Sequence, residues 1–198
     1  MKKEISEKNI LDAALNVISE NTISNTRMHM IAKEAGMSKT NLFYHFESKK
    51  ELLLALLKDL QKTFKEQRRA EINKIDGNDV SKKVSGFLNR EKNLLRENPK
   101  YDLVQFDFWT LSQSDPEIRH EFLESYKEWH KHIYDTLVSC CPKTDERQLS
   151  HISYIMITMM MGTAMQYLIH TEAFDLDEYF SICKTLLLDY IYKLNVED

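Results

Sequence analysis

The sequence has few of the residues that interrupt helices. Its 198 residues include only four glycines and three prolines. A protein rich in tight turns needs more of both, because glycine and proline supply the backbone angles that many turns require. Long stretches that mix leucine with charged residues favour helices instead. We therefore expect an all-α fold.

Cysteine is also scarce. The three that are present, Cys140, Cys141 and Cys183, do not have the spacing of metal ligands and suit a reducing compartment. The N-terminus lacks the basic and then apolar pattern of a secretory leader. These absences predict a cytoplasmic protein.

The chain as a whole has no excess of positive charge, because its net charge is −4. The two ends differ, however. Residues 1–65 carry 11 Lys and Arg against 8 Asp and Glu, a net of +3, whereas residues 66–198 carry 16 against 23, a net of −7. The N-terminal part can therefore meet phosphates while the acidic remainder does not, although so small an excess is weak evidence by itself.

An uninterrupted membrane span is absent as well. The apolar run at residues 152–169 reaches the threshold of about 18 residues, but polar or small residues interrupt it. They are Ser153, Thr158, Gly162, Thr163 and Gln166. A helix that is apolar nearly all round is buried on several sides. We expect this helix to pack on its own domain and on a partner subunit, with burial inside one subunit as the alternative.

The most informative stretch is residues 26–51, which predicts two short helices, a tight turn and the start of a third helix. We expect Thr26 and Ser38 to cap the two short helices, because a hydroxyl can accept a free backbone N–H. Gly36 lies where the chain must turn with a positive φ. Leu42 and Phe46 are one turn apart and are expected to point inward.

Polar residues occupy the opposite face of the second short helix. We expect the side chains of Lys39, Thr40, Asn41, Tyr44 and His45 to face outward. A cation with short hydrogen-bonding groups suits a DNA major groove. The same pattern also fits a helical hairpin with a solvated polar face.

Residues 6–60 resemble the N-terminal domain of the TetR family of bacterial transcription regulators. The residues that carry the resemblance are Ile10, Leu11, Ala13, Ala14, Thr26, Ile31, Ala32, Ala35, Gly36, Ser38, Lys39, Leu42, Tyr44, His45, Phe46, Lys49, Leu52 and Leu53. The resemblance implies a three-helix helix-turn-helix DNA-binding domain at residues 1–50. It also implies a C-terminal helical bundle for ligand binding and dimerisation at residues 51–198, with about nine helices in total.

Local signals predict the helix bounds. The first helix covers about residues 6–20, and a capping box at residues 48–51 opens a long fourth helix. Further helices are expected at about 79–97, at 100–112, from 114–117 to about 141, from 144–146 to about 171, and from 175–178 to about 193. By resemblance, residues 146–170 and 176–194 of two subunits form a four-helix dimer interface.

The family's DNA contacts can be transferred onto matching positions. Lys39, Thr40 and Asn41 occupy the start of the recognition helix, where side chains usually reach base edges. Tyr44, His45 and Lys49 match positions that hold phosphates, and Phe43 stands where the family often has a tyrosine. The predicted DNA-binding residues are Thr26, Ser38, Lys39, Thr40, Asn41, Phe43, Tyr44, His45 and Lys49.

The family also encloses a small-molecule pocket between its fifth to eighth helices. Aromatic and methionine side chains are common in the corresponding part of this chain, and they predict a roomy apolar pocket. Each one taken singly is more often a core residue. The predicted ligand-binding residues are Phe106, Trp109, Tyr126, Trp129, Met161, Met165 and Gln166. Asp102, Asp107 and Glu128 would select a cation only if they pointed inward.

We expect a repressor that a small hydrophobic ligand releases from a palindromic operator. The alternatives are an activator, a regulator without a ligand, and a redox sensor that uses Cys140, Cys141 or Cys183. An enzyme is not expected, and neither a cofactor nor a metal, because none of the seven histidines has a metal-binding spacing and no nucleophile motif is present. The operator sequence and the ligand cannot be read from the sequence.

Overall fold

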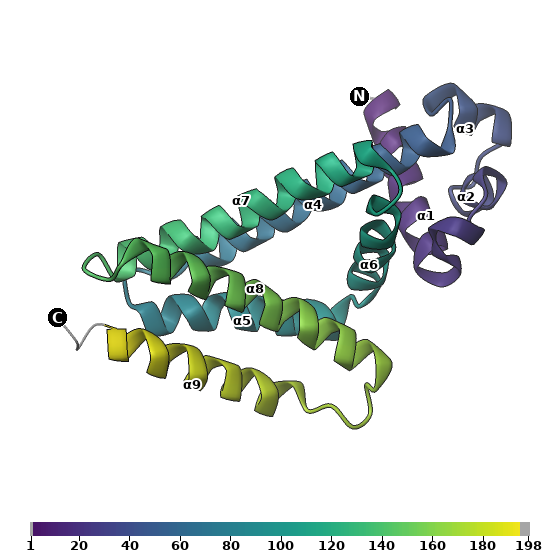
Figure 1. The fold of residues 1–198 in the computed structure, drawn as a ribbon. Coiled ribbons are helices and arrows are strands. Elements are labelled where there is room, and N and C mark those ends of the chain that lie inside the picture. The colour runs from purple at the N-terminus through teal and green to yellow at the C-terminus, as the bar shows by residue number, and fades with distance from the viewer. Residues whose placement is uncertain (1, 195–198) are drawn as a thin grey trace. The chain divides into compact units, whose positions relative to one another are not determined.

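A computed structural model describes the backbone of residues 2–194 and the side chains of residues 7–194. Within this part the chain forms α-helices and no strands, which confirms the all-α prediction (Figure 1). The helices are α1 (Lys2–Asn25), α2 (Met28–Glu34), α3 (Lys39–His45), α4 (Lys49–Asn73), α5 (Val80–Glu97), α6 (Lys100–Ser112), α7 (Pro116–Cys140), α8 (Glu146–Ile169) and α9 (Leu176–Leu194). The predicted helices after residue 48 therefore agree closely with the observed ones.

The chain divides into two compact units, and each is described by itself. Unit 1 comprises Met1–Phe64 and Lys100–Ser125, and unit 2 comprises Lys65–Pro99 and Tyr126–Asp198. The division falls within α4 and within α7. It concerns compactness rather than function, so the functional boundary at residue 50 stays a prediction. The outer ends of the two predicted domains, at residues 1 and 198, lie outside the described residues.

The core of unit 1 is built from regular apolar spacing. Ile10, Ala14 and Ile18 follow one another at four-residue intervals along α1 and are all buried. Helix α1 packs against α2 and α6, and α2 packs against α3. Leu42 of α3 and Phe46 just after it are buried in the same unit, as predicted. The short helix α3 is thus held by side chains on one face only.

The chain bends sharply between α1 and α2. Thr22 has φ 66° and ψ 160°, which interrupts α1 near its C-terminal end. The hydroxyl of Thr26 donates to the carbonyl of Thr22 at 2.7 Å. The residue at the N-cap of α2 is Arg27, without a side-chain cap. The prediction that Thr26 caps this helix is therefore wrong, because its hydroxyl closes the preceding turn instead.

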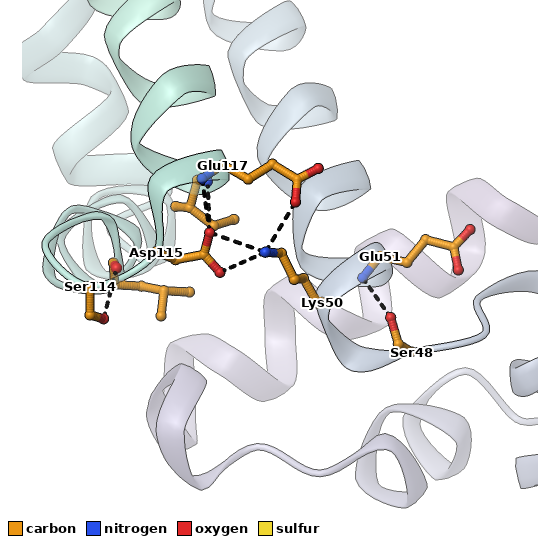
Figure 2. Close-up of polar contacts among 8 residues, drawn as sticks. Ser48, Lys50, Glu51, Ser114, Asp115 and Glu117 are labelled. Atoms are coloured by element: carbon orange, nitrogen blue, oxygen red, sulfur yellow. Dashed lines mark hydrogen bonds and ion pairs between the residues drawn. The ribbon is translucent and has the colours of Figure 1, made fainter.

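The two other turn signals are confirmed. Gly36 has φ +66°, the left-handed conformation that favours glycine. The hydroxyl of Ser38 accepts the N–H of Asn41 at 3.1 Å, so Ser38 caps α3. Ser48 accepts the N–H of Glu51 at 3.1 Å in the same way and begins α4 (Figure 2).

In unit 2, α5 packs against both α8 and α9, and α8 also contacts α9. The first turn of α9 is fixed to α5 by Asp177, which pairs with Lys92 at 2.7 Å and also with Arg96. Helix α8 is long and apolar enough to cross a membrane, yet less than half of its most apolar stretch is buried. Ile152, Met156 and Met160 form its buried side.

Candidate DNA-binding surface and ligand pocket

Helix α3 presents polar side chains around its first turn. Lys39, Thr40 and Asn41 are exposed, and they directly precede Leu42, which is fully buried. Tyr44 is 78% exposed. This arrangement confirms that α3 has a buried face and an outward polar face. The outward groups include hydrogen-bond donors and acceptors that can reach base edges, and a phenol that can donate to a phosphate.

Phe43 is 37% exposed, and the ammonium of Lys39 lies 5.6 Å from the centre of its ring. The two residues are one helical turn apart, so the cation and the ring face lie on the same side of α3. Phe43 therefore contributes to the exposed face of α3.

His45 does not face outward as predicted. Its side chain is only 7% exposed, and its Nδ1 lies 4.0 Å from a carboxylate oxygen of Glu7. His45 follows Leu42 by three residues, and side chains with that spacing lie on the same side of a helix. A contact from this imidazole to DNA would need it to turn out of unit 1.

Thr26 and Lys49 also lie away from the exposed face. Thr26 is 1% exposed. Lys49 is half-buried, its ammonium donates to the carbonyl of Ile23, and burial lowers its pKa. The N–H of Ile23 donates to Asp107 of α6. The side chains of Lys49 in α4 and Asp107 in α6 therefore bind the carbonyl and the N–H of Ile23, beside the kink at Thr22 near the C-terminal end of α1.

The first turn of α4 carries a further link that sequence reasoning missed (Figure 2). The ammonium of Lys50 lies 3.0 Å from a carboxylate oxygen of Asp115 and 3.0 Å from one of Glu117. Asp115 also accepts the N–H groups of Glu117 and Ile118, at 3.0 and 3.2 Å, so it caps α7. Its hydrogen bond with Lys50 contributes most to a lowered pKa of Asp115. The starts of α4 and α7 are thus joined within unit 1.

A pocket lies inside unit 2 among α4, α5, α7 and α8. Its lining residues are Arg68, Glu71, Ile72, Gly86, Phe87, Arg90, Glu91, Trp129 and Met160. The pocket is closed in this structure, with no room for a water molecule. Four of its nine lining residues are charged, and the others include apolar side chains.

The guanidinium of Arg68 lies over the Trp129 ring, 4.9 Å from its centre. Arg68 is 8% exposed and Trp129 is 7% exposed. Burial, with Arg90 next in importance, lowers the pKa of Arg68 to about 9, so the group stays charged at neutral pH. Burial and then Arg68 lower the pKa of the nearby His132 to about 4. Both shifts indicate positive charge in a poorly hydrated region.

Of the seven predicted ligand residues, only Trp129 lines this pocket. The ring of Tyr126 lies 6.2 Å from that of Trp129, and Met161 is half-buried. Met165 and Gln166 are exposed, whereas Phe106 and Trp109 belong to unit 1. The structure therefore does not gather the predicted set at one pocket.

The charged lining residues were missed because charged helical residues are usually solvated. A signal was nonetheless present in the spacing. Arg68 follows Phe64 by four residues and extends the apolar stripe of α4, and Glu91 follows Phe87 by four residues on the stripe of α5. A charge that replaces an apolar residue on such a stripe is a candidate for burial.

The thiols offer little reactivity. Cys141 and Cys183 are buried and Cys140 is half-buried. Burial raises the pKa of Cys140 and of Cys183, which disfavours the reactive thiolate. Among the described side chains, no three His, Cys, Asp or Glu residues come together as a metal site.

Comparison with known proteins matches both parts of the chain. The model of bacterial regulatory proteins of the tetR family matches residues 10–56, and that of the BetI-type transcriptional repressor C-terminal region matches residues 94–191. The HTH-type transcriptional regulator RutR of Escherichia coli strain K12 is 46% identical over 54 residues, which are 27% of this chain and 26% of RutR. The chain thus matches about a quarter of that relative's length.

Two solved structures share the fold over nearly the whole chain. The transcriptional regulator FadR from Bacillus subtilis, in complex with stearoyl-CoA, has a TM-score of 0.76 at 22% identity and covers 91% of this chain and 96% of its own. A protein from Saccharomonospora viridis assigned as a transcriptional regulator, in complex with choline, has a TM-score of 0.80 at 24% identity and covers 96% of each chain. The two bound molecules differ in charge and size, so the fold alone does not select a ligand.

Proposed function

This chain belongs to the TetR family of bacterial transcription regulators, and from that membership we propose that it is a repressor which a small molecule releases from a palindromic operator. Residues 1–50 read the DNA, and residues 51–198 bind the ligand and a second subunit. Since the protein acts on bacterial DNA, it works in the cytoplasm. The observation that carries this proposal is the exposed first turn of α3, anchored by the buried Leu42.

Base recognition falls to Lys39, Thr40 and Asn41. Lysine can donate to guanine O6 and N7, asparagine can pair with adenine N6 and N7, and the threonine methyl can touch a thymine methyl. Ser38 and Tyr44 are exposed beside them and are suited to phosphates. Thr26, His45 and Lys49 have internal contacts in this structure, so their part in DNA binding is secondary in this proposal.

A homodimer is supported by apolar surface that unit 2 leaves uncovered. Ile182, Leu186 and Tyr190 recur every four residues along α9 and are all exposed. On α8, Ile155, Met165 and Ile169 are exposed as well. A methyl group added at Gly162, which lies between them, would meet no atom within 4 Å. A second copy of this surface would cover these side chains as a four-helix interface.

Light scattering tests the dimer. We expect Leu186→Glu to give a monomer at micromolar concentration, because the carboxylate would be buried in the interface. Ser181→Glu is the matched control, since Ser181 is exposed on α9 away from the stripe. A wild-type monomer, or a Leu186→Glu dimer, would contradict the proposed interface.

The ligand acts through the pocket of unit 2. Helix α4 is continuous from Lys49 to Asn73, so the element that follows α3 by only a few residues also lines the pocket. A ligand releases the operator only if it binds the DNA-free conformation more tightly, since equal affinity for both conformations shifts nothing. An activator with the same fold is the alternative, and transcription from the regulated promoter decides between them.

A selection from randomised DNA duplexes tests DNA recognition. We expect an inverted repeat whose half-sites have the spacing set by the dimer, about one helical turn or more apart. Failure to recover any inverted repeat at low or moderate salt would refute the proposal.

A further inference from the structure

We infer that the ligand of this pocket carries an anionic head group, which Arg68 and Trp129 bind, joined to an apolar body. This inference rests on the proposed ligand-responsive function and names the chemical class of the ligand. Its starting point is the buried guanidinium of Arg68 in unit 2, which Glu91 and Glu128 attract without forming an ion pair with it. Within residues 7–194, neither a hydrogen bond nor an ion pair is found at the guanidinium of Arg68, whose contact is the Trp129 ring.

The carboxylates near Arg68 have other cations beside them. Glu91 lies 2.9 Å from Arg90, and Glu71 lies 2.8 Å from Lys74. Glu128 lies 2.7 Å from Lys65. Each of these acids is thus ion-paired with another cation. Glu91 and Glu128 still attract Arg68, but neither forms an ion pair with its guanidinium.

Burying a charge without a partner is unfavourable, and proteins normally pair or hydrogen-bond such a group. A guanidinium offers planar, paired donors that match a carboxylate or a phosphate. An anion in the pocket would therefore replace the hydration that Arg68 has lost. A cationic ligand would instead be repelled by Arg68 and Arg90.

A second unsatisfied group belongs to a residue that lines the same pocket. The indole N–H of Trp129 is buried and has no hydrogen-bond partner within the described part of the chain. Buried donors nearly always have an acceptor, so this one calls for an explanation. An anion with two or more oxygens can accept from both Arg68 and Trp129.

The rest of the lining sets the character of the ligand body. Ile72, Phe87 and Met160 supply apolar walls. Because the pocket is closed, a ligand must move side chains to enter, and the long side chains of Met160 and Arg68 can shift by rotation about single bonds. Movement of Arg68 would change the surroundings of the Trp129 ring.

A change in the surroundings of the Trp129 ring can be measured by its fluorescence. The chain has two tryptophans, and the other, Trp109, belongs to unit 1. In a Trp109→Phe protein, Trp129 fluorescence therefore reports on the pocket alone. We would titrate this protein with decanoate, decyl phosphate, decanol and decyltrimethylammonium below their micelle concentrations, so that the apolar tail stays constant while the head group changes.

We expect the two anions to change the fluorescence at concentrations about ten- to a hundredfold lower than decanol, the ratio that a charge-assisted hydrogen bond provides. Decyltrimethylammonium should bind more weakly than decanol. The ratio of the decanoate and decyl phosphate affinities identifies which anion the pocket prefers. Equal binding of anion and alcohol, preference for the cation, or no response to either anion would overturn the inference.

Two variants of the Trp109→Phe protein localise the effect. Arg68→Gln should weaken decanoate binding about ten- to a hundredfold while changing decanol binding little. Arg69→Gln is the matched control, because Arg69 is the exposed neighbour on α4. Unchanged decanoate affinity in Arg68→Gln would overturn the role of Arg68.

Operator binding is measured separately. Decanoate that binds the pocket without releasing DNA would contradict the proposed repressor mechanism while leaving the anion site intact. Release of DNA by decyltrimethylammonium but not by decanoate would keep a ligand-responsive repressor and overturn the anion site.

Discussion

The polar groups of α3 in unit 1 and those of the pocket in unit 2 lie in opposite environments. Lys39, Thr40 and Asn41 are exposed and keep their contact with water, so they can exchange it for DNA at little cost. Arg68 and Trp129 have lost water without gaining a full set of partners. Exposed polar groups are hydrated and do not destabilise the fold when they have no partner. Buried polar groups without a partner reduce the stability of the fold until a ligand binds them.

The sharpest test of this contrast lies within α3 itself. Leu42→Ala should lower the free energy of unfolding by about 2–5 kcal/mol, because it leaves a cavity beneath the helix. Tyr44→Ala should change it by less than about 0.5 kcal/mol, since Tyr44 is largely exposed, while it weakens DNA binding. Denaturant unfolding and DNA titration measure the two effects. Similar losses of stability in both variants would mean that α3 does not have two distinct faces.

Asn41→Ala should cost about 1–3 kcal/mol of binding free energy at one base pair of the operator and leave the other positions unaffected. The physical reason is the loss of a two-point contact with one base. Titration of the selected operator and of its single-base variants measures the effect. A loss that is the same on operator and random DNA would assign Asn41 to phosphate contact instead.

In unit 2, removal of a polar group should act in the opposite direction. Arg68→Met should raise the free energy of unfolding by about 1 kcal/mol or more, because it removes an unpaired buried charge and keeps an apolar stem. Arg69→Met, at the exposed neighbouring position, should change it by less than about 0.5 kcal/mol. Denaturation midpoints compare the two. Destabilisation by Arg68→Met would show that Arg68 has a structural partner in the assembled protein.

A further test concerns pH. The pKa of His132 in the folded chain is about 4, below its ordinary value of 6.5, so the unfolded chain takes up a proton before the folded chain does. Stability should therefore be fully present above about pH 6.5 and decline as the pH falls towards 4. His132→Gln should remove part of this decline, which melting temperatures at pH 7.5 and pH 5 would show. Identical pH dependence in both proteins would exclude His132 as the cause.

The sequence predicted the fold well because apolar spacing, caps and turn glycines act locally. Gly36, Ser38 and Ser48 each took the predicted conformation, although the carboxylate of Glu51 accepts the N–H of Glu47 rather than that of Ser48. The exposed polar face of α3 followed from the inward positions of Leu42 and Phe46. His45 was misplaced, since its burial depends on packing against α1.

The pocket could be predicted far less well. Its defining contacts join helices that are distant in the sequence, such as Arg68 of α4 over Trp129 of α7. Aromatic content alone could not separate Trp129 from Trp109, which is half exposed in the other unit. Periodicity shows which face of a helix is buried, but not which faces meet.

The Ile23 main chain, held by Lys49 and Asp107, has a consequence for how quickly the protein finds its site. Because both polar backbone groups of Ile23 are already bound, we expect the segment that leads into α2 and α3 to change conformation little when the protein binds DNA. The association rate should then differ little among DNA sequences. Discrimination between operators would reside in how long each complex lasts.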